Sequence, residues 1–115
     1  MFVTLELNTE VQLGTVIQYD TIDQSWITAT NESYPLGVVK DSNQDTSSGK
    51  WLTRVVVAGV AYALAASNIP DQGGFVAVEN GRVKLSEVEK YGVIAPRTFG
   101  ESQREAGSLV MIHLR

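Results

Sequence analysis

The pair Asn80-Gly81, set between two apolar segments, is the sequence feature that most constrains the fold. Asn-Gly is the preferred pair for a two-residue type I′ turn, because both turn residues need a positive φ, which asparagine tolerates and glycine adopts freely. This turn opposes Glu79 with Arg82 and separates the apolar side chains from the charged ones. The residues that share the apolar face are Val76, Val78, Val83 and Leu85. The pattern predicts an antiparallel hairpin with one buried face.

The preceding glycines, Gly73-Gly74, raise the alternative of a phosphate-binding loop. Such a loop needs a helix N-terminus directly after its glycines, together with a GxGxxG spacing or a Lys-Ser/Thr pair. A strand follows here instead. We therefore interpret these glycines as a turn that leads into the hairpin.

Strand signals recur along the whole chain as short segments rich in β-branched and aromatic residues. They cover residues 15–19, 26–30, 52–57, 75–78, 82–85 and 109–114. Turn-forming clusters separate them at residues 20–25, 31–35, 41–50, 67–74 and 99–107. The pattern predicts an all-β fold, a small antiparallel barrel or sandwich with at most one short helical turn. For residues 60–66 we favour strand over helix, whereas residues 85–90 are a candidate for that turn.

The chain divides into an N-terminal arm or edge strand, residues 1–12, and a single β-barrel domain, residues 13–115. The arm alternates over residues 1–7, with Val3, Leu5 and Leu7 on one side. A terminal strand must pair with something, so it either closes the barrel or joins the sheet edge of a neighbouring chain.

Three glycine-anchored matches indicate an internal duplication into two similar halves. Gly14 aligns with Gly73, and Gly37 aligns with Gly92. Seventeen residues after the second glycine of each half come Arg54 and Leu109, which open apolar strands. Each half then runs strand, turn, strand, Gly-Val-Val or Gly-Val-Ile, long polar loop and closing strand.

Composition excludes several classes of protein. The chain of 115 residues has no cysteine, which removes disulfides and thiolate metal sites. Its net charge of −4, without a basic cluster, disfavours direct nucleic-acid binding. The longest apolar run, residues 55–66, falls well short of the roughly 20 residues that cross a bilayer, and the N-terminus lacks the pattern of a signal peptide. We expect no membrane association.

The segment from Asp41 to Asp45 starts like a calcium-binding EF-hand loop, with oxygen-bearing residues at its first, third and fifth positions. The match ends at Thr46, where glycine is needed, and at Leu52, where a bidentate glutamate belongs. We interpret it as a solvated loop. The single histidine, His113, lies in the last strand without a Ser or Asp motif beside it, so we expect a surface or interface role.

The remaining chemical candidates are carboxylates and aromatic rings that are able to form a glycosidase pair or a sugar-binding face. The carboxylates are Asp20, Asp23, Glu32, Asp71, Glu79, Glu87, Glu89, Glu101 and Glu105. The rings are Tyr19, Trp26, Tyr34, Trp51 and Tyr62. We interpret the first group as solvated charge and the second as core or interface anchors. The sequence thus predicts no catalytic residue, no cofactor and no metal.

Residues 55–94, together with the final Ala-Gly-led strand at 106–114, resemble the small capsid decoration (cement) proteins of tailed bacteriophages. In that family a repeated phrase is of the type Gly-Val-Ala, small residues, Ile-x-x-Gly-x-x-Val, Asn-Gly, Gly-Val-Ala/Ile and Ala-Gly-x-x-Val. A fainter echo covers residues 13–40, and the chain departs from the pattern at Ala95-Pro96-Arg97-Thr98.

The resemblance implies a compact β-barrel virion protein without catalytic activity. It implies binding to the major capsid protein on the capsid surface as a homo-oligomer, often a trimer, after assembly in the host cytoplasm. The residues we select as partner contacts are Phe2, Val3, Leu5, Trp51, Arg97 and Phe99. Two alternatives stay open: a phage tail, baseplate or fibre-attachment module, and a small β-barrel carbohydrate-binding or hydrolytic domain.

Overall fold

The computed structural model describes residues 1–30 and 35–114. This part of the chain is all β, with 52% of the residues in strands and no helix. The strands are β1 (Phe2–Leu7), β2 (Val16–Asp20), β3 (Ser25–Thr28), β4 (Pro35–Gln44), β5 (Trp51–Val56), β6 (Gly59–Leu64), β7 (Gly74–Glu79), β8 (Arg82–Ser86), β9 (Gly92–Ile94) and β10 (Leu109–Leu114). A membrane-crossing helix is accordingly not found in the described ranges.

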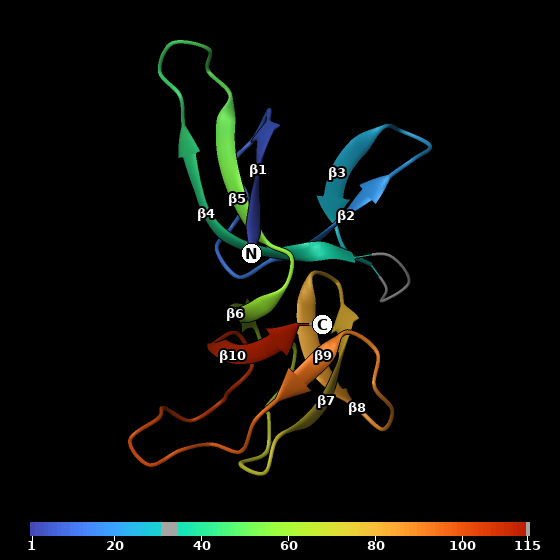
Figure 1. Cartoon of the computed structure of the whole chain (residues 1–115), viewed down its shortest axis with the longest axis vertical. Helices are drawn as coiled ribbons and strands as arrows, with labels where there is room; N and C mark the ends of the chain where they lie inside the picture. Colours follow the sequence, from blue (N-terminus) through green and yellow to red (C-terminus); the bar gives the residue numbers. More distant parts are fainter. Residues whose placement is uncertain (31–34, 115) are drawn as a thin grey trace.

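The strands form two antiparallel five-stranded sheets that pack together as a sandwich (Figure 1). The first sheet has the order β1-β5-β4-β2-β3, and the second has the order β6-β10-β9-β7-β8. Neither sheet closes on itself. Of the two expected architectures the sandwich is therefore the correct one, and the N-terminal segment is an edge strand that pairs with β5 of its own chain.

The two sheets have the same strand order, with every strand number raised by five. The predicted duplication into two similar halves is thus confirmed at the level of topology. Register supports it as well: Ile17 lies opposite Gly37, and Val76 lies opposite Gly92. Ile17 and Val76 each come three residues after the first predicted anchors, Gly14 and Gly73.

The third predicted anchor is wrong by two residues. Val38 pairs with Val56 in the first half, and the equivalent Val93 pairs with His113 in the second. This register makes Arg54 equivalent to Met111, not to Leu109. The connection between β4 and β5 differs in length from the connection between β9 and β10. The reason is that β4 continues into a long hairpin with a register shift between Val39 and Asp41, whereas β9 ends at Ile94.

The second pair of anchors has a steric explanation that the sequence alone did not show. A Cβ atom added to Gly37 would collide with the carbonyl oxygen of Val56. A Cβ atom on Gly92 would collide with the carbonyl oxygen of the equivalent residue, His113. Both halves therefore need glycine where the fourth strand approaches the fifth so closely.

The hairpin prediction is confirmed in register and in turn geometry. Glu79 pairs with Arg82, and Val76 pairs with Leu85. Asn80 and Gly81 have φ values of 48° and 78°, as a type I′ turn requires. The apolar side chains of this hairpin enter the core.

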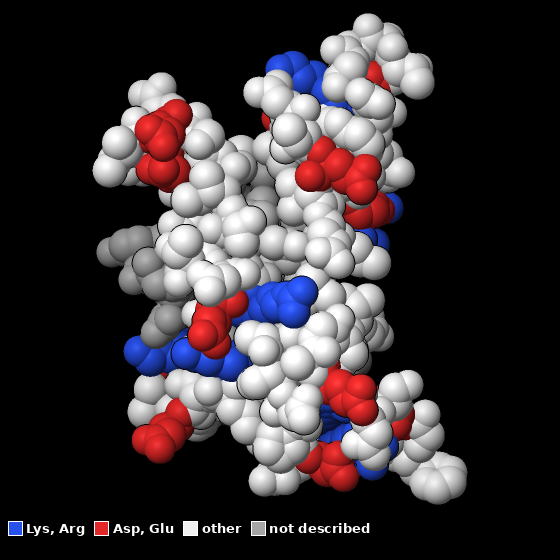
Figure 2. Space-filling view, turned by 180° about the vertical axis from the view of Figure 1, so that it is seen from behind, with Lys and Arg blue, Asp and Glu red and all other residues white. Residues whose placement is uncertain are grey.

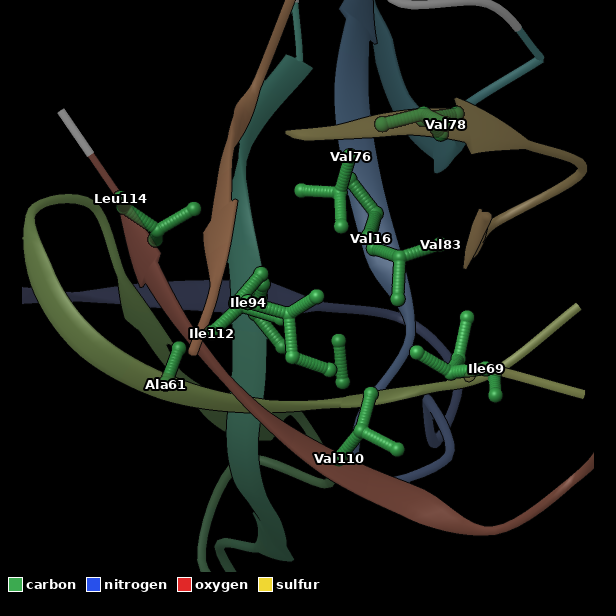
Figure 3. Close-up of a cluster of buried hydrophobic side chains, with 14 residues drawn as sticks. Val16, Ala61, Ile69, Val76, Val78, Val83, Ile94, Val110, Ile112 and Leu114 are labelled. Carbon is green, nitrogen blue, oxygen red and sulfur yellow. The ribbon is translucent and has the colours of Figure 1, made fainter. Parts of the chain in front are cut away.

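The main hydrophobic core lies between the sheets (Figure 3). Most of its fourteen buried residues come from the second half, but Val16, Ala29 and Val38 come from the first. A smaller cluster of Ile17, Val39 and Val55 lies on the other face of the first sheet. The halves consequently share one core and do not have a complete core each.

The expected strands agree with the observed ones to within two residues at their ends, and residues 60–64 are strand as favoured. The expected polar loop at residues 41–50 is wrong in its first part, because β4 runs on to Gln44 and pairs with β5. The candidate helical turn at residues 85–90 is not helical. Residues 31–34 of the turn predicted at residues 31–35 lie outside the described residues. The same holds for the candidates Glu32 and Tyr34.

Candidate protein-docking surface

An open apolar groove of about 480 Å³ is lined by the N-terminal ends of β1 and β6 and by part of β4. Its lining comes from both halves of the duplication and from the segment that leads into β2. The exposed apolar side chains in it are Met1, Phe2, Leu13, Val60, Tyr62 and Leu109, whose exposed fractions range from 44% to 83%. Single exposed apolar residues are ordinary, but a contiguous set of this size is typical of an interaction surface.

Strand alternation explains why these side chains are exposed together. On β6, Ala61 and Ala63 point into the main core, so Val60 and Tyr62 point to the opposite face. On β1, Phe2 lies opposite Val56, whose side chain packs against the main core from the side. Gly14 fixes the nearby segment of Leu13, because its carbonyl oxygen accepts a hydrogen bond of 2.9 Å from the N–H of Leu64.

Cations border the groove beside the aromatic ring of Phe2. The Nζ atom of Lys40 lies 5.3 Å from the centre of this ring, and the Cζ atom of Arg54 lies 5.5 Å from it. Both distances are within the range of cation–π attraction. The guanidinium of Arg54 also forms an ion pair with Asp41 and holds the pKa of that carboxyl below its usual value. Within the described residues Lys40 forms no ion pair of its own, although its charge also helps to lower the pKa of Asp41.

The structure places the predicted contact residues of the N-terminal half in one sheet but on two faces. Phe2 lines the groove. Val3 and Leu5 belong to the opposite face of β1, where Leu5 packs against the smaller core cluster. Trp51 lies opposite Leu7 and is partly buried.

The other two predicted contact residues lie in the second half, on the connection from 95 to 108. Arg97 is already engaged, since its Nε donates to Asp71 Oδ1 at 2.8 Å and its Nη1 donates to the carbonyl oxygen of Glu101 at 2.8 Å. Phe99 is fully exposed. The six residues thus do not form a single surface, and their role as contacts stays a prediction.

Sequence reasoning missed three of the groove residues, Leu13, Val60 and Leu109, and considered Tyr62 only as one aromatic among several. A signal for Val60 and Tyr62 existed in the sequence. Small alanines alternate with Val60 and Tyr62 in β6, which is the pattern of a strand with one tightly packed face and one open face. Nothing local marks Leu13 or Leu109, because their exposure depends on how the halves meet.

The segment with the EF-hand-like start is organised by hydrogen bonds within the protein. Asp41 is paired with Arg54 on the neighbouring strand. The carboxylate of Asp45 accepts hydrogen bonds from the backbone N–H and hydroxyl of Ser47 and from the hydroxyl of Ser48, which lower its pKa. No group of three or more metal-ligating side chains occurs in the ranges 1–30 and 35–114.

The remaining candidates are dispersed. His113 is exposed on β10, opposite Val60 and Val93. Tyr19 and Trp26 form an edge-to-face pair with ring centres 4.9 Å apart, on the β2–β3 hairpin. Of the carboxylates, Asp71 and Glu101 pair with Arg97 and Arg104 of the second half.

No protein-family model matches this chain, and a search of curated proteins found no match. The observations that bear on function are therefore the apolar groove, its cationic border and the duplicated sheet.

Proposed function

We propose that this chain is a non-enzymatic structural protein that docks on the surface of another protein through the apolar groove at β1 and β6. The observation that carries the proposal is the exposure of six apolar side chains around one concavity. Two of them, the methionine Met1 and the aromatic Phe2, lie at the N-terminal end of the chain. Aromatic residues and methionine are enriched at protein interfaces, and they bind best when a partner excludes water from them.

The resemblance to capsid decoration proteins supplies the partner. In this proposal the chain binds the major capsid protein on the outside of a tailed-phage shell, as a homo-oligomer, with a trimer favoured. Each contact is modest, and the symmetry of the shell multiplies it. Bridging of neighbouring subunits buries surface that must be exposed again before the shell can rupture, so the protein acts as a clamp.

Shell binding tests both parts of this proposal. Shells assembled from the accompanying major capsid protein are mixed with the purified chain and sedimented, and the bound fraction is measured. We expect Tyr62→Ser and Leu109→Ser to weaken binding at least about tenfold, which corresponds to about 1.4 kcal/mol. Ile22→Ser is the matched control, because Ile22 is an exposed apolar residue of the β2–β3 connection and lies outside the groove.

The outcomes separate the partner from the surface. Binding by the wild type that is unchanged in both groove variants would place the contact elsewhere on the chain. A wild type that does not bind shells would contradict the capsid assignment. Copy number per virion then distinguishes a shell protein, present in hundreds of copies, from a tail, baseplate or fibre component.

A further inference from the structure

The two halves differ in how their outer strands meet. In the second half, the chain just after β6 reaches β8: Ala65 bridges Val83, and the N–H of Ala66 donates to the carbonyl oxygen of Val83 at 2.8 Å. The strands in the equivalent places of the first half are β1 and β3. The register makes Leu7 equivalent to Ala65 and Trp26 equivalent to Val83. In the described structure no pairing joins β1 to β3, and the β2–β3 hairpin diverges from the other strands (Figure 1).

A groove of about 460 Å³ occupies this gap. Its apolar lining consists of Leu7, Val11, Ile17, Trp26 and Ile27. Val11 comes four residues after Leu7, just as Ile69 comes four residues after Ala65. Ile69 is 4% exposed and belongs to the main core, whereas Val11 is only partly buried.

The connection from 95 to 108 accounts for this difference in burial. It covers Ile69, since the N–H of Ile69 donates to the carbonyl oxygen of Arg104 and the N–H of Gly107 donates to that of Ala65, both at 2.8 Å. The corresponding connection in the first half is the β4–β5 hairpin, which projects away from the body (Figure 1). The first half is thus an opened version of the second.

Both borders of this gap have backbone groups that are available for pairing. The N–H of Val57 donates to the carbonyl oxygen of Met1, so alternation turns the backbone groups of Thr4 and Glu6 away from β5. Directly after β3, the N–H of Ala29 donates to the carbonyl oxygen of Val16. Alternation therefore turns the backbone N–H and C=O groups of Trp26 and Thr28 away from β2. A free edge of this kind is a template for an added strand.

The charges around the gap are acidic. Glu10 lines the groove, and the exposed Glu6 lies on β1. Residues 1–58 contain seven acidic and three basic side chains, whereas residues 59–115 contain six of each. The nearby Lys50 donates to Asn8 Oδ1 at 2.5 Å. Figure 2 shows acidic side chains on both upper lobes, which belong to the first half, and basic side chains on one of the two.

We propose that the gap between β1 and β3 is a strand-accepting site for an extended segment of another polypeptide. The segment places apolar side chains toward Val11 and Trp26 and basic side chains on its alternate positions, toward Glu6 and Glu10. Its backbone pairs with a free edge, as in β-strand addition. This site is separate from the apolar docking groove at β1 and β6, and the proposal does not depend on the capsid assignment.

The probe is a blocked heptapeptide that alternates lysine and valine, titrated into the full chain with Trp51→Phe, so that Trp26 is the one indole reporter. We expect a saturable shift of the Trp26 emission to shorter wavelength. The double variant Glu6→Lys with Glu10→Lys should weaken binding at least tenfold while leaving the fold intact, because both residues are exposed. Thr4→Pro removes an edge N–H that does not pair with β5 and should weaken binding as well.

A second peptide, with glutamate in place of lysine, is the matched control and should not bind. Equal binding of the two peptides would overturn the proposal, because it would show plain hydrophobic adsorption. Absence of a saturable shift would overturn it too. A shift that depends on protein concentration without any peptide, with a doubled mass in light scattering, would assign the gap to a second copy of this chain and contradict the proposed occupant.

Discussion

Gly81 connects the two sheets through its backbone. Its N–H donates to the carbonyl oxygen of Ala29 at 2.6 Å, and its carbonyl oxygen accepts from the N–H of Val16 at 2.8 Å. The hairpin turn that contains it is therefore inserted against the first sheet. A Cβ atom at this position would collide with Cγ2 of Thr28, and the positive φ of 78° would strain any other residue.

The substitution Gly81→Val should lower the free energy of unfolding by about 3 kcal/mol, because it combines backbone strain with overpacking. Gly49→Val is the matched control: Gly49 also has a positive φ, of 75°, but a Cβ atom added there would have no other atom within 4 Å. We expect the control to lose only the strain, about 1–2 kcal/mol. Urea denaturation of both variants measures the difference, and equal losses would show that the contact with the first sheet is unimportant.

The β4–β5 hairpin shows how an element can extend beyond its sequence signal. Residues 41–44 are polar and turn-like, yet they form strand because Asp41 lies opposite Arg54 and Asn43 lies opposite Leu52. The Nε of Arg54 donates to both carboxylate oxygens of Asp41 at 2.9 Å. This cross-strand ion pair stabilises the continued ladder and also orients Arg54 toward Phe2.

The ion pair between Asp41 and Arg54 makes a pH-dependent contribution to the free energy of unfolding, and the direction of the pKa shift fixes its sign. Hydrogen bonding by Arg54 lowers the pKa of Asp41 below 3.8 in the folded protein, so the contribution is present above about pH 4 and is lost as the pH falls through the folded-state pKa. Asp41→Asn should therefore lower the free energy of unfolding at pH 7 by less than about 1 kcal/mol, since the pair is partly exposed. The loss should shrink toward zero in acid, as measured by urea denaturation across that range. Asp23→Asn removes the same charge from an exposed turn, and a similar pH profile in this control would refute the assignment.

The whole molecule is held together by one core with unequal contributions from the halves. Val16, Ala29 and Val38 complete a cluster whose other members belong to the second half. Backbone hydrogen bonds from Leu64 to Gly14 and from Val16 to Gly81 join the halves as well. Neither half alone satisfies its buried groups.

The full chain should consequently unfold in a single transition. Val38→Ala in the first half and Ile112→Ala in the second should each lower the free energy of unfolding, by about 2 and 3–4 kcal/mol respectively. Both should shift the same transition in calorimetry. Two separable transitions, or a folded fragment of residues 59–115 with dispersed NMR signals, would show that the halves are independent.

Local chemistry explains which features could be predicted from the sequence. The Asn80-Gly81 turn, most strand positions and the alignment of Gly14 with Gly73 follow from residue types and short spacings. The extended β4 and the offset of the third repeat anchor were not predictable, because they depend on partners in β5 and on a register shift. Of the candidate docking surface, the sequence indicated Phe2, but it did not indicate Leu13 or Leu109, which become neighbours only when the first half packs against the second.

By itself the sequence determined an all-β chain with two related halves, since turn chemistry and alternation act over a few residues. Only the tertiary structure decided that the halves share one core, that the second half is covered by the 95–108 connection and that the first half is open. The physical reason is that burial and edge pairing depend on contacts between segments far apart in the chain. The same repeated pattern of strands can therefore end in a closed arrangement in one half and in an open groove in the other.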